Sequence, residues 1–297
     1  MPERTNENYR QNLKIPKSIL YTAKALQFIS ANQAAKFAAK LFQTPIKYAT
    51  PKREIHMERE AVKSTLEVPE IHKTIQTYRY GTGDKKVLLV HGWCGRGTQL
   101  VKIADALVQN GYATISFDGP AHGKSSGKTT NMLEFSKCIM EIERAYGPFD
   151  AAVGHSLGSM ALLYSAREGL DVKRMVLIGT GDKIEDIIYA FTDKLELDRS
   201  TGVMLKESLD DKFKIDINNF SASVSAAKVS IPVLLIHDEL DFDSPVEASL
   251  KINQILKQSK LIITQGLGHR KILGDPAVIK QLLEFIQANT NKNVTLN

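Results

Sequence analysis

Hydrophobic positions in the first part of the chain recur at helical spacing. Eight apolar residues between 17 and 42 fall on one face: Ile19, Leu20, Ala23, Leu26, Ala34, Phe37, Ala38 and Leu41. Three lysines, Lys24, Lys36 and Lys40, fall elsewhere, and Pro45 and Pro51 follow the segment. The pattern predicts one or two helices that pack on the main domain with a solvated lysine face. A membrane-surface anchor or a wall of a binding-site entrance are the alternatives.

The period of the pattern changes to two from Arg53 onward. Ile55 and Met57 alternate with polar residues, and residues 71–79 alternate again, which predicts an antiparallel strand pair. The first wholly apolar strand is KVLLV at residues 86–90, and this composition suits the middle of a parallel sheet.

Strand and helix patterns then alternate along the chain. Further strands are predicted at residues 112–117, 149–153, 174–178, 231–236 and 261–264, and helices at 99–109, 132–145, 157–167, 246–256 and 276–287. Repeated strand–helix units connect by right-handed crossovers, so the fold class is α/β with a doubly wound, mostly parallel sheet.

The alternation stops between residues 181 and 227, which contain helical pieces such as 184–195 and no parallel strand. An insertion of this size usually lies over the carboxyl edge of the sheet as a cap. The domain prediction is a helical extension at 1–50, a core in two parts at 51–180 and 228–297, and a helical cap at 181–227. We expect Phe191 and its apolar neighbours to line a substrate pocket; the alternative is that this helix packs away from the pocket.

Composition excludes several classes of protein. Hydrophobic residues make up 43% and charged residues 24%, as in ordinary globular proteins. No apolar run approaches the roughly 18 residues of a membrane span, and the polar first ten residues argue against a secretory signal. The two cysteines, Cys94 and Cys138, make no disulfide framework, so we expect a reducing, cytoplasmic location.

Charge is concentrated at one end of the chain. Residues 1–53 hold seven lysines and three arginines against two glutamates, a net charge of +8; because the whole chain carries +6, the rest carries −2. No basic groove with interleaved aromatic residues is present, so we expect no nucleic-acid partner. Contact of the basic N-terminal helix with a membrane surface is compatible with this pattern but is not the favoured prediction.

The polar motifs of the chain follow the predicted strands. The motifs are HGWCGRG after 86–90, DGPAHGKS after 112–117, GHSLG around Ser156, HDELDFDSP after 231–236 and QGLGHR after 261–264. Ligands of a parallel sheet bind beyond the carboxyl ends of its strands, so these motifs should meet at one site. Ser156 stands where a strand turns directly into a helix, which requires a strained serine flanked by small residues such as Gly154 and Gly158.

In this order the motifs resemble the α/β-hydrolase superfamily, in its esterase, lipase and serine-aminopeptidase-like branch, over roughly residues 52–290. The resemblance implies that Ser156 is the nucleophile and His269 the general base. It implies Asp241, four residues before Pro245, as the acid that orients His269. The family usually has glycine at the position of Asp238 and a branched apolar residue at that of Ser244, so Asp238 stays open as an alternative acid.

An oxyanion hole needs two donors. The amide of Leu157 lies at a helix N-terminus, and the resemblance suggests the amide of Trp93 as the second donor. The Trp93 indole and His155 are candidates for the substrate pocket. The resemblance also implies structural or pocket-lining roles for His91 and His122, whereas His56, His72 and His237 are expected to be structural only. No histidine or cysteine spacing fits a metal site, and no cofactor is expected.

The predicted function is that of a serine hydrolase, a carboxylesterase in the first instance, acting on a small-molecule ester, thioester or small amide through an acyl-enzyme. A cap of about 45 residues favours small or medium acyl groups. A C–C bond hydrolase or a cofactor-free perhydrolase is possible on the same fold. A non-enzymatic binding protein is the alternative from another class, although such proteins typically lose one member of the triad and all three candidates are present here.

Overall fold

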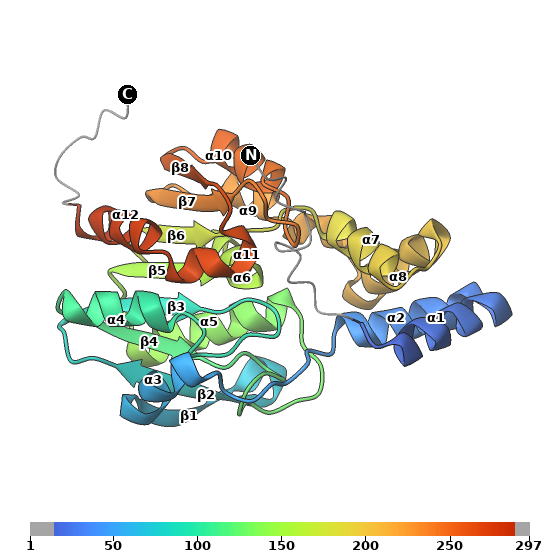
Figure 1. Cartoon of the computed structure of the whole chain (residues 1–297), viewed down its shortest axis with the longest axis horizontal. Helices are drawn as coiled ribbons and strands as arrows, with labels where there is room; N and C mark the ends of the chain where they lie inside the picture. Colours follow the sequence, from blue (N-terminus) through green and yellow to red (C-terminus); the bar gives the residue numbers. More distant parts are fainter. Residues whose placement is uncertain (1–14, 289–297) are drawn as a thin grey trace, which may run out of the picture.

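The computed structural model describes residues 15–288, and its centre is an eight-stranded sheet (Figure 1). The strand order is β1-β2-β4-β3-β5-β6-β7-β8. The strands are β1 (Val62–Val68), β2 (Lys73–Tyr80), β3 (Lys85–Val90), β4 (Tyr112–Phe117), β5 (Ala151–His155), β6 (Met175–Ile178), β7 (Val233–Asp238) and β8 (Ser259–Thr264). β1, β2 and β4 pair antiparallel, and all pairs from β4 to β8 are parallel. This confirms the predicted doubly wound, mostly parallel sheet.

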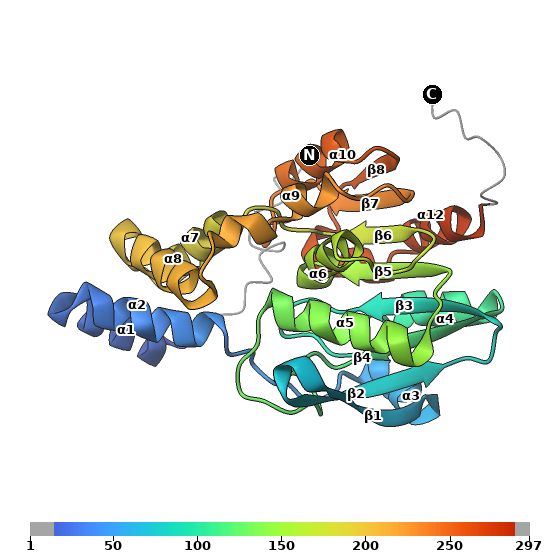
Figure 2. The ribbon, with the colours of Figure 1, turned by 180° about the vertical axis from the view of Figure 1, so that it is seen from behind.

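Two helical layers cover the sheet (Figures 1 and 2). One core cluster packs the sheet against α5 (Met132–Tyr146), α6 (Leu157–Arg167), α9 (Ala222–Ala226) and α10 (Glu247–Ile255). The other packs it against α3 (Ile55–Glu60), α4 (Val101–Gln109) and α12 (Pro276–Gln287). Because both faces are covered, β4, β5, β6 and β7 are buried along their whole length, which explains their continuous apolar sequences. Short elements complete the chain: α11 (Gly268–Lys271), η2 (Lys52–Glu54), η3 (Pro69–Ile71), η4 (Ile217–Phe220) and η5 (Ile272–Gly274).

The predicted antiparallel pair exists, but the prediction that Ile55 and Met57 belong to its first strand is wrong. These residues form α3, and the strand begins only at Val62. The buried positions here are Glu54, Met57 and Ala61, whose spacing of three and four residues is helical. Two alternating residues were therefore too short a pattern to separate a strand from one helical turn.

Four helices form a separate group beyond the carboxyl ends of the parallel strands (Figures 1 and 2). The N-terminal hairpin consists of α1 (Lys17–Ile29) and α2 (Ala31–Phe42), and Ser30 caps α2 by accepting from the amide of Gln33. It packs on α7 (Ile184–Lys194) and α8 (Arg199–Phe213), which follow β6. The third core cluster joins the two pairs through Ala23, Ala34 and Ala38 of the hairpin and Ile188 and Leu205 of the cap.

The hairpin and the cap are also joined by a polar contact. The side-chain oxygen Oε1 of Gln27 accepts from the amide of Asp198 at 2.8 Å and from the hydroxyl of Thr201 at 2.9 Å. Within residues 15–288, no helix is both long and apolar enough to cross a bilayer.

Candidate active site

Ser156 occupies a strained turn between β5 and α6. Its backbone angles are φ 54° and ψ −118°, in the left-handed region that costs energy for a residue with a side chain. A Cβ at Gly158 would lie 2.3 Å from the carbonyl oxygen of Val90, so only glycine lets α6 start this close to β3. The amide of Ser156 donates to Ile178 O at 2.9 Å, which ties the turn to the end of β6.

His269 and Asp241 form a hydrogen-bonded pair near this turn. Nδ1 of His269, in α11, lies 2.6 Å from Oδ2 of Asp241, which follows β7. The Asp241 side chain is only 1% exposed, and its Oδ1 accepts from the amides of Asp243 and Ser244 at 2.9 Å each. Burial by itself raises the pKa of Asp241, but hydrogen bonds from His237 and His269 outweigh it and hold that pKa well below its usual range. Asp241 is therefore an anion that fixes a proton on Nδ1 of His269.

Gly179 lies between the backbone of Ser156 and the Asp241–His269 pair. It follows β6 directly after Ile178, whose carbonyl holds Ser156, and its φ is +57°. A Cβ at this position would lie 3.2 Å from Nδ1 of His269 and 3.3 Å from Oδ2 of Asp241. The end of β6 thus contacts the serine backbone on one side and the acid–histidine pair on the other. Sequence reasoning missed Gly179, because a single glycine after a strand is ordinary.

Asp238 does not contact His269. Its Oδ2 accepts from the Thr264 hydroxyl at 2.7 Å and from the amide of Leu267 at 2.9 Å, and its Oδ1 accepts from the amide of Leu240. The buried Asp238 carboxylate therefore ties the loop after β7 to the loop that carries His269. Of the two candidate acids, the structure brings Asp241 to the histidine.

His237 lies behind the acid and is fully buried. Its Nε2 donates to Ser244 O at 2.9 Å and lies 3.4 Å from Oδ2 of Asp241, while its Nδ1 accepts from the Ser249 hydroxyl at 2.7 Å. Both histidines therefore approach the same oxygen of Asp241, and His237 also holds the loop through Ser244. Sequence reasoning assigned it only a structural position.

The loop after β3 leaves one amide unused beside Ser156. Gly92 donates to Oε1 of Gln99 at 2.9 Å, Cys94 to Nε2 of His122 at 3.1 Å, and Gly95 to the carbonyl of Gly92 at 2.9 Å. In the described part of the chain, the amide of Trp93 has no acceptor. A Cβ on Gly92 would lie 3.0 Å from Cβ of Ser156, so this loop touches the serine.

The amide of Leu157, the first residue of α6, is the second donor at this point, because the first amides of a helix have no partner within the helix. The amides of Trp93 and Leu157 are therefore the candidates for the two donors that an oxyanion hole requires.

Two buried histidines hold this loop. His91 donates from Nδ1 to Gly92 O at 2.7 Å and accepts at Nε2 from the amide of Gly119 at 2.8 Å. His122 donates from Nδ1 to Pro120 O and accepts from Cys94. Burial lowers the pKa of His91 to about 4 and that of His122 to about 3, so both rings are neutral. Their contacts order the backbone on which Trp93 lies.

His155, the residue before Ser156, connects the turn to the histidine loop. Its Nε2 donates to the backbone carbonyl of His269 at 2.8 Å, and the two rings lie 4.6 Å apart. Burial, with the neighbouring His269, lowers the pKa of His155 to about 3, so the ring is neutral. Its side chain is buried, which makes it a support for His269 and not the pocket-lining residue that the sequence suggested.

Two models of protein families match most of the described chain. A family model described as alpha/beta hydrolase fold matches residues 85–199, and a model described as TAP-like protein matches residues 218–294. The two matches lie on either side of α8 and together include the segments of Ser156, Asp241 and His269. The chain belongs to the α/β-hydrolase superfamily.

Solved structures with the α/β-hydrolase fold cover most of the chain at low sequence identity. A Pyrococcus furiosus esterase is 18% identical, with a TM-score of 0.62, and the match covers 82% of this chain and 96% of that one. An esterase from Exiguobacterium antarcticum is 16% identical, with a TM-score of 0.61 and coverages of 76% and 100%. A monoacylglycerol lipase from Paleococcus ferrophilus is 23% identical, with a TM-score of 0.57 and coverages of 71% and 98%. None of the curated proteins matches the sequence of this chain.

Phe191 of this α/β-hydrolase is not placed where the sequence predicted it. Its ring packs edge to face on Phe42 of α2, with ring centroids 5.3 Å apart. Ile184 and Ile187 of α7 pack on the core cluster that includes Met160 of α6, and a Cβ on Gly181 would touch both Ile187 and Met160. The hairpin, which the sequence predicted to pack on the main domain, packs on the cap and partly buries Phe191 there.

The segment between the hairpin and the hydrolase core runs along the loop of Trp93. The amide of Ile46 donates to Sγ of Cys94 at 3.3 Å, and Arg96 donates to Thr50 Oγ1 at 2.9 Å. Lys47 donates to Gly123 O at 3.1 Å, in the loop that also carries His122. This linker is therefore fastened to the same two loops that carry the oxyanion-hole candidate and its support.

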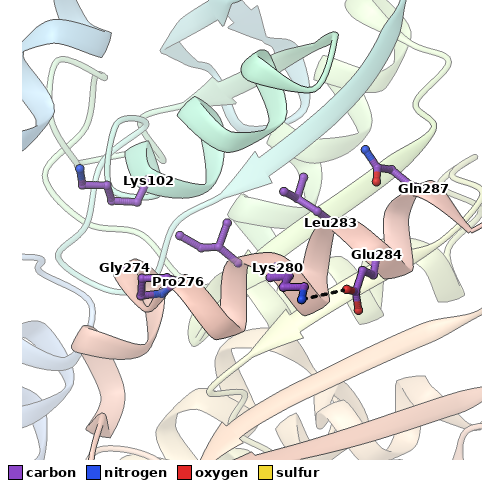
Figure 3. A pocket seen from close by; sticks show the side chains of 8 residues that line it. Lys102, Gly274, Pro276, Lys280, Leu283, Glu284 and Gln287 are labelled. Carbon is purple, nitrogen blue, oxygen red and sulfur yellow. Dashed lines mark ion pairs between the residues drawn. The ribbon is translucent and has the colours of Figure 1, made fainter.

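A shallow groove of about 500 Å³ lies elsewhere, between α4 and α12 (Figure 3). Its lining includes Lys102, Pro276, Ile279, Lys280 and Leu283, and none of the candidate catalytic residues belongs to it. Within residues 15–288 there is also no cluster of three or more potential metal ligands.

Proposed function

We propose that this α/β-hydrolase is a serine hydrolase that cleaves a carboxylic ester, thioester or small amide through an acyl-enzyme on Ser156. The observation that carries the proposal is the short Asp241–His269 hydrogen bond, together with the contact between His269 and His155, the residue before the strained Ser156. A histidine oriented by a buried carboxylate is the usual base of a serine nucleophile, because it leaves Nε2 free to accept a proton.

In the proposed acylation, Oγ of Ser156 attacks the carbonyl carbon and its proton passes to Nε2 of His269. The carbonyl oxygen becomes an oxyanion, which accepts hydrogen bonds from the amides of Trp93 and Leu157. The new imidazolium is stabilised by the Asp241 carboxylate through Nδ1. It then protonates the leaving group, and the bond between the acyl carbon and the leaving atom breaks.

Deacylation repeats these steps with water. Water loses a proton to Nε2 of His269 and attacks the acyl carbon, and the oxyanion again forms beside Trp93 and Leu157. His269 returns the proton to Oγ of Ser156, which leaves as the free serine. No net proton is left on the enzyme, and no cofactor enters the scheme.

The names of similar structures support an ester substrate. They include two esterases and a monoacylglycerol lipase, although their identities are all below 25%. We propose a carboxylesterase that acts on esters with a small or medium acyl group. Ile187 of α7 and Met160 of α6 are the apolar side chains that we propose to contact this group.

A fluorophosphonate probe tests the proposal directly, because it labels only an activated serine. We expect labelling of the intact protein, with the adduct mapped to the peptide that contains Ser156, and no labelling of the Ser156→Ala variant. Ser200→Ala, which removes an exposed serine of α8, is the matched control and should label normally. A folded protein that takes up no probe would overturn the proposal and favour a binding function on the same fold.

The leaving group and acyl chain need a second experiment. p-Nitrophenyl esters of increasing chain length, with an acyl-CoA and an aminoacyl amide alongside, give kcat/KM for each class. A clear maximum among the short or medium esters is the expected result, whereas faster turnover of the thioester or the amide would change the substrate class.

A further inference from the structure

The outer face of α1 is apolar, although it points away from the protein. Tyr21, Phe28 and Ile29 are 68%, 94% and 76% exposed, and Ala25 between them is exposed as well. Their spacing of four, three and one residues places them on one side of the helix. We call these four residues the α1 strip.

The strip is not a poorly packed part of the core. Ala23 of the same helix is fully buried, and Leu26 packs with it in the cluster shared by the hairpin and the cap. Those residues lie on the side of the helix opposite the strip, so α1 has two apolar faces. One is buried against the cap, and large contiguous apolar surfaces left exposed on a protein usually mark interaction sites.

The hairpin around the strip is cationic. Residues 15–50 contain five lysines and no aspartate, glutamate or arginine. Lys24 is paired with Glu196 of the cap, and Lys47 donates to carbonyl groups of the core. The other three, Lys17, Lys36 and Lys40, are exposed and make no ion pair with any residue between 15 and 288. Their charges are available to an external partner.

We propose that the α1 strip docks the protein on an anionic lipid surface. Aromatic and aliphatic side chains on one helix face, flanked by lysines, match the chemistry of such an interface, because the apolar groups enter the acyl boundary and the ammonium groups stay among the headgroups. A second copy of this chain is a poorer occupant, since it would bring lysine-rich hairpins together. A helix of 13 residues is also only about 20 Å long. One face of such a helix is too small to bury the roughly 800 Å² per partner of a stable protein interface.

The position of the hairpin gives the docking a consequence. The hairpin projects from the sheet on the same side as α7 and α8, beyond the carboxyl ends of the parallel strands (Figures 1 and 2). Ser156 directly follows one of these strands, β5. Docking through α1 would therefore hold the cap beside the lipid surface. The binding step itself does not depend on the proposed hydrolase activity.

Co-sedimentation with vesicles tests the strip. The full chain is mixed with vesicles of phosphatidylcholine and phosphatidylglycerol, or of phosphatidylcholine alone, and we expect binding to the first. The variant Phe28→Ser/Ile29→Ser should lower the partition coefficient at least about tenfold, because it removes two large apolar groups from the interface. Val62→Ser, at a 55% exposed valine on the edge strand β1, is the matched control and should bind like the parent.

A charge-reversal variant tests the contribution of the exposed lysines. Lys17→Glu/Lys36→Glu should weaken binding about fivefold or more for each lysine, and added salt should weaken binding of the parent in the same direction. Lys257→Glu, at an exposed lysine after α10, makes the same kind of change outside the hairpin and should have a much smaller effect.

The outcomes separate the possible occupants. Absence of binding, equal binding to both vesicle types, or unchanged binding by Phe28→Ser/Ile29→Ser would each overturn the proposal. A concentration-dependent dimer that this variant abolishes, without vesicle binding by the parent, would assign the strip to a second copy. Thermal unfolding checks that each variant is folded, and Tyr21→Ser is the substitute if the double variant is not. Fluorophosphonate labelling stays as a separate measure of the active site.

Discussion

Replacing Asp241 or Asp238 with asparagine should have different effects. Asp241→Asn should mainly lower turnover, whereas Asp238→Asn should mainly lower stability. In Asp241→Asn, the amide oxygen can keep the two hydrogen bonds from Asp243 and Ser244, which turns the NH2 group toward His269. An N–H donor then faces the N–H of His269 Nδ1. The proton of His269 moves to Nε2, so the imidazole can no longer accept the proton of Ser156. Turnover should fall by about 10³- to 10⁴-fold.

In Asp238→Asn, the same exchange affects stability more than chemistry. The hydroxyl of Thr264 can turn and act as an acceptor, but the amide of Leu267 cannot, and one half-buried donor loses its partner. Such a loss costs about 1–3 kcal/mol. Because the Asp241–His269 bond is untouched, we expect turnover to fall by less than roughly tenfold, through small displacements of the histidine loop.

Two measurements give the comparison. Steady-state hydrolysis of a p-nitrophenyl ester gives kcat and KM, and urea unfolding at neutral pH gives the free energy of unfolding for the same preparations. The reasoning is refuted if Asp238→Asn loses thousands-fold in kcat while Asp241→Asn stays within a few-fold of the parent. Equal activity losses in the two variants would also refute it, because only Asp241 makes a hydrogen bond with the His269 side chain.

Three further variants test other parts of the site. Gly179→Ala should lower kcat/KM by about ten- to a hundredfold, because the new Cβ presses on the acid–histidine pair at 3.2 Å and the positive φ adds about 1 kcal/mol of strain; parental activity would contradict this. Gln99→Met should slow acylation by about tenfold by freeing the amide of Gly92 and loosening the oxyanion loop, and an unchanged rate of probe labelling would count against it. His122→Gln should make stability less sensitive to acid: the folded pKa of His122, about 3, lies below the unfolded value near 6.5, so the unfolded chain binds more protons and stability falls as pH drops below about 6.5. Between pH 7 and 5 the parent should lose about 2 kcal/mol more than the variant in urea unfolding, and identical slopes would exclude this role.

The central sheet was predictable because its strands obey a local rule. A strand buried on both faces needs a continuous apolar run, and the segments at Tyr112 and Val233 show this pattern in sequence. The strained turn at Ser156 was predictable for a similar reason, because it requires small residues such as Gly158 at fixed positions in the sequence. The spacing of Asp241 to Pro245, taken from the family resemblance, pointed to the acid that contacts His269 in the structure.

The contacts between distant segments were not predictable. Nothing near Phe191 in sequence says that Phe42 covers it, because the two are brought together only when the hairpin packs on α7. Gly179 acts through His269 and Asp241, which are far away along the chain, and it lies in no motif. The outer face of α1 was expected to be a lysine face, whereas Phe28 and Ile29 occupy it, since the periodicity identified which residues are buried but not how apolar the opposite side is.

The packing of the hairpin on the cap has a consequence for biosynthesis. Gln27 and Asp198, which join the two, are 171 residues apart, so this contact closes a very long loop. At about 5–20 residues per second, a ribosome needs roughly 10–30 s to make the partner after it has made the hairpin. During that time the face of α1 that packs on α7 and α8 in the folded protein has no native partner. The hairpin thus reaches its native contacts only after a segment made much later, α7 and α8, has been translated.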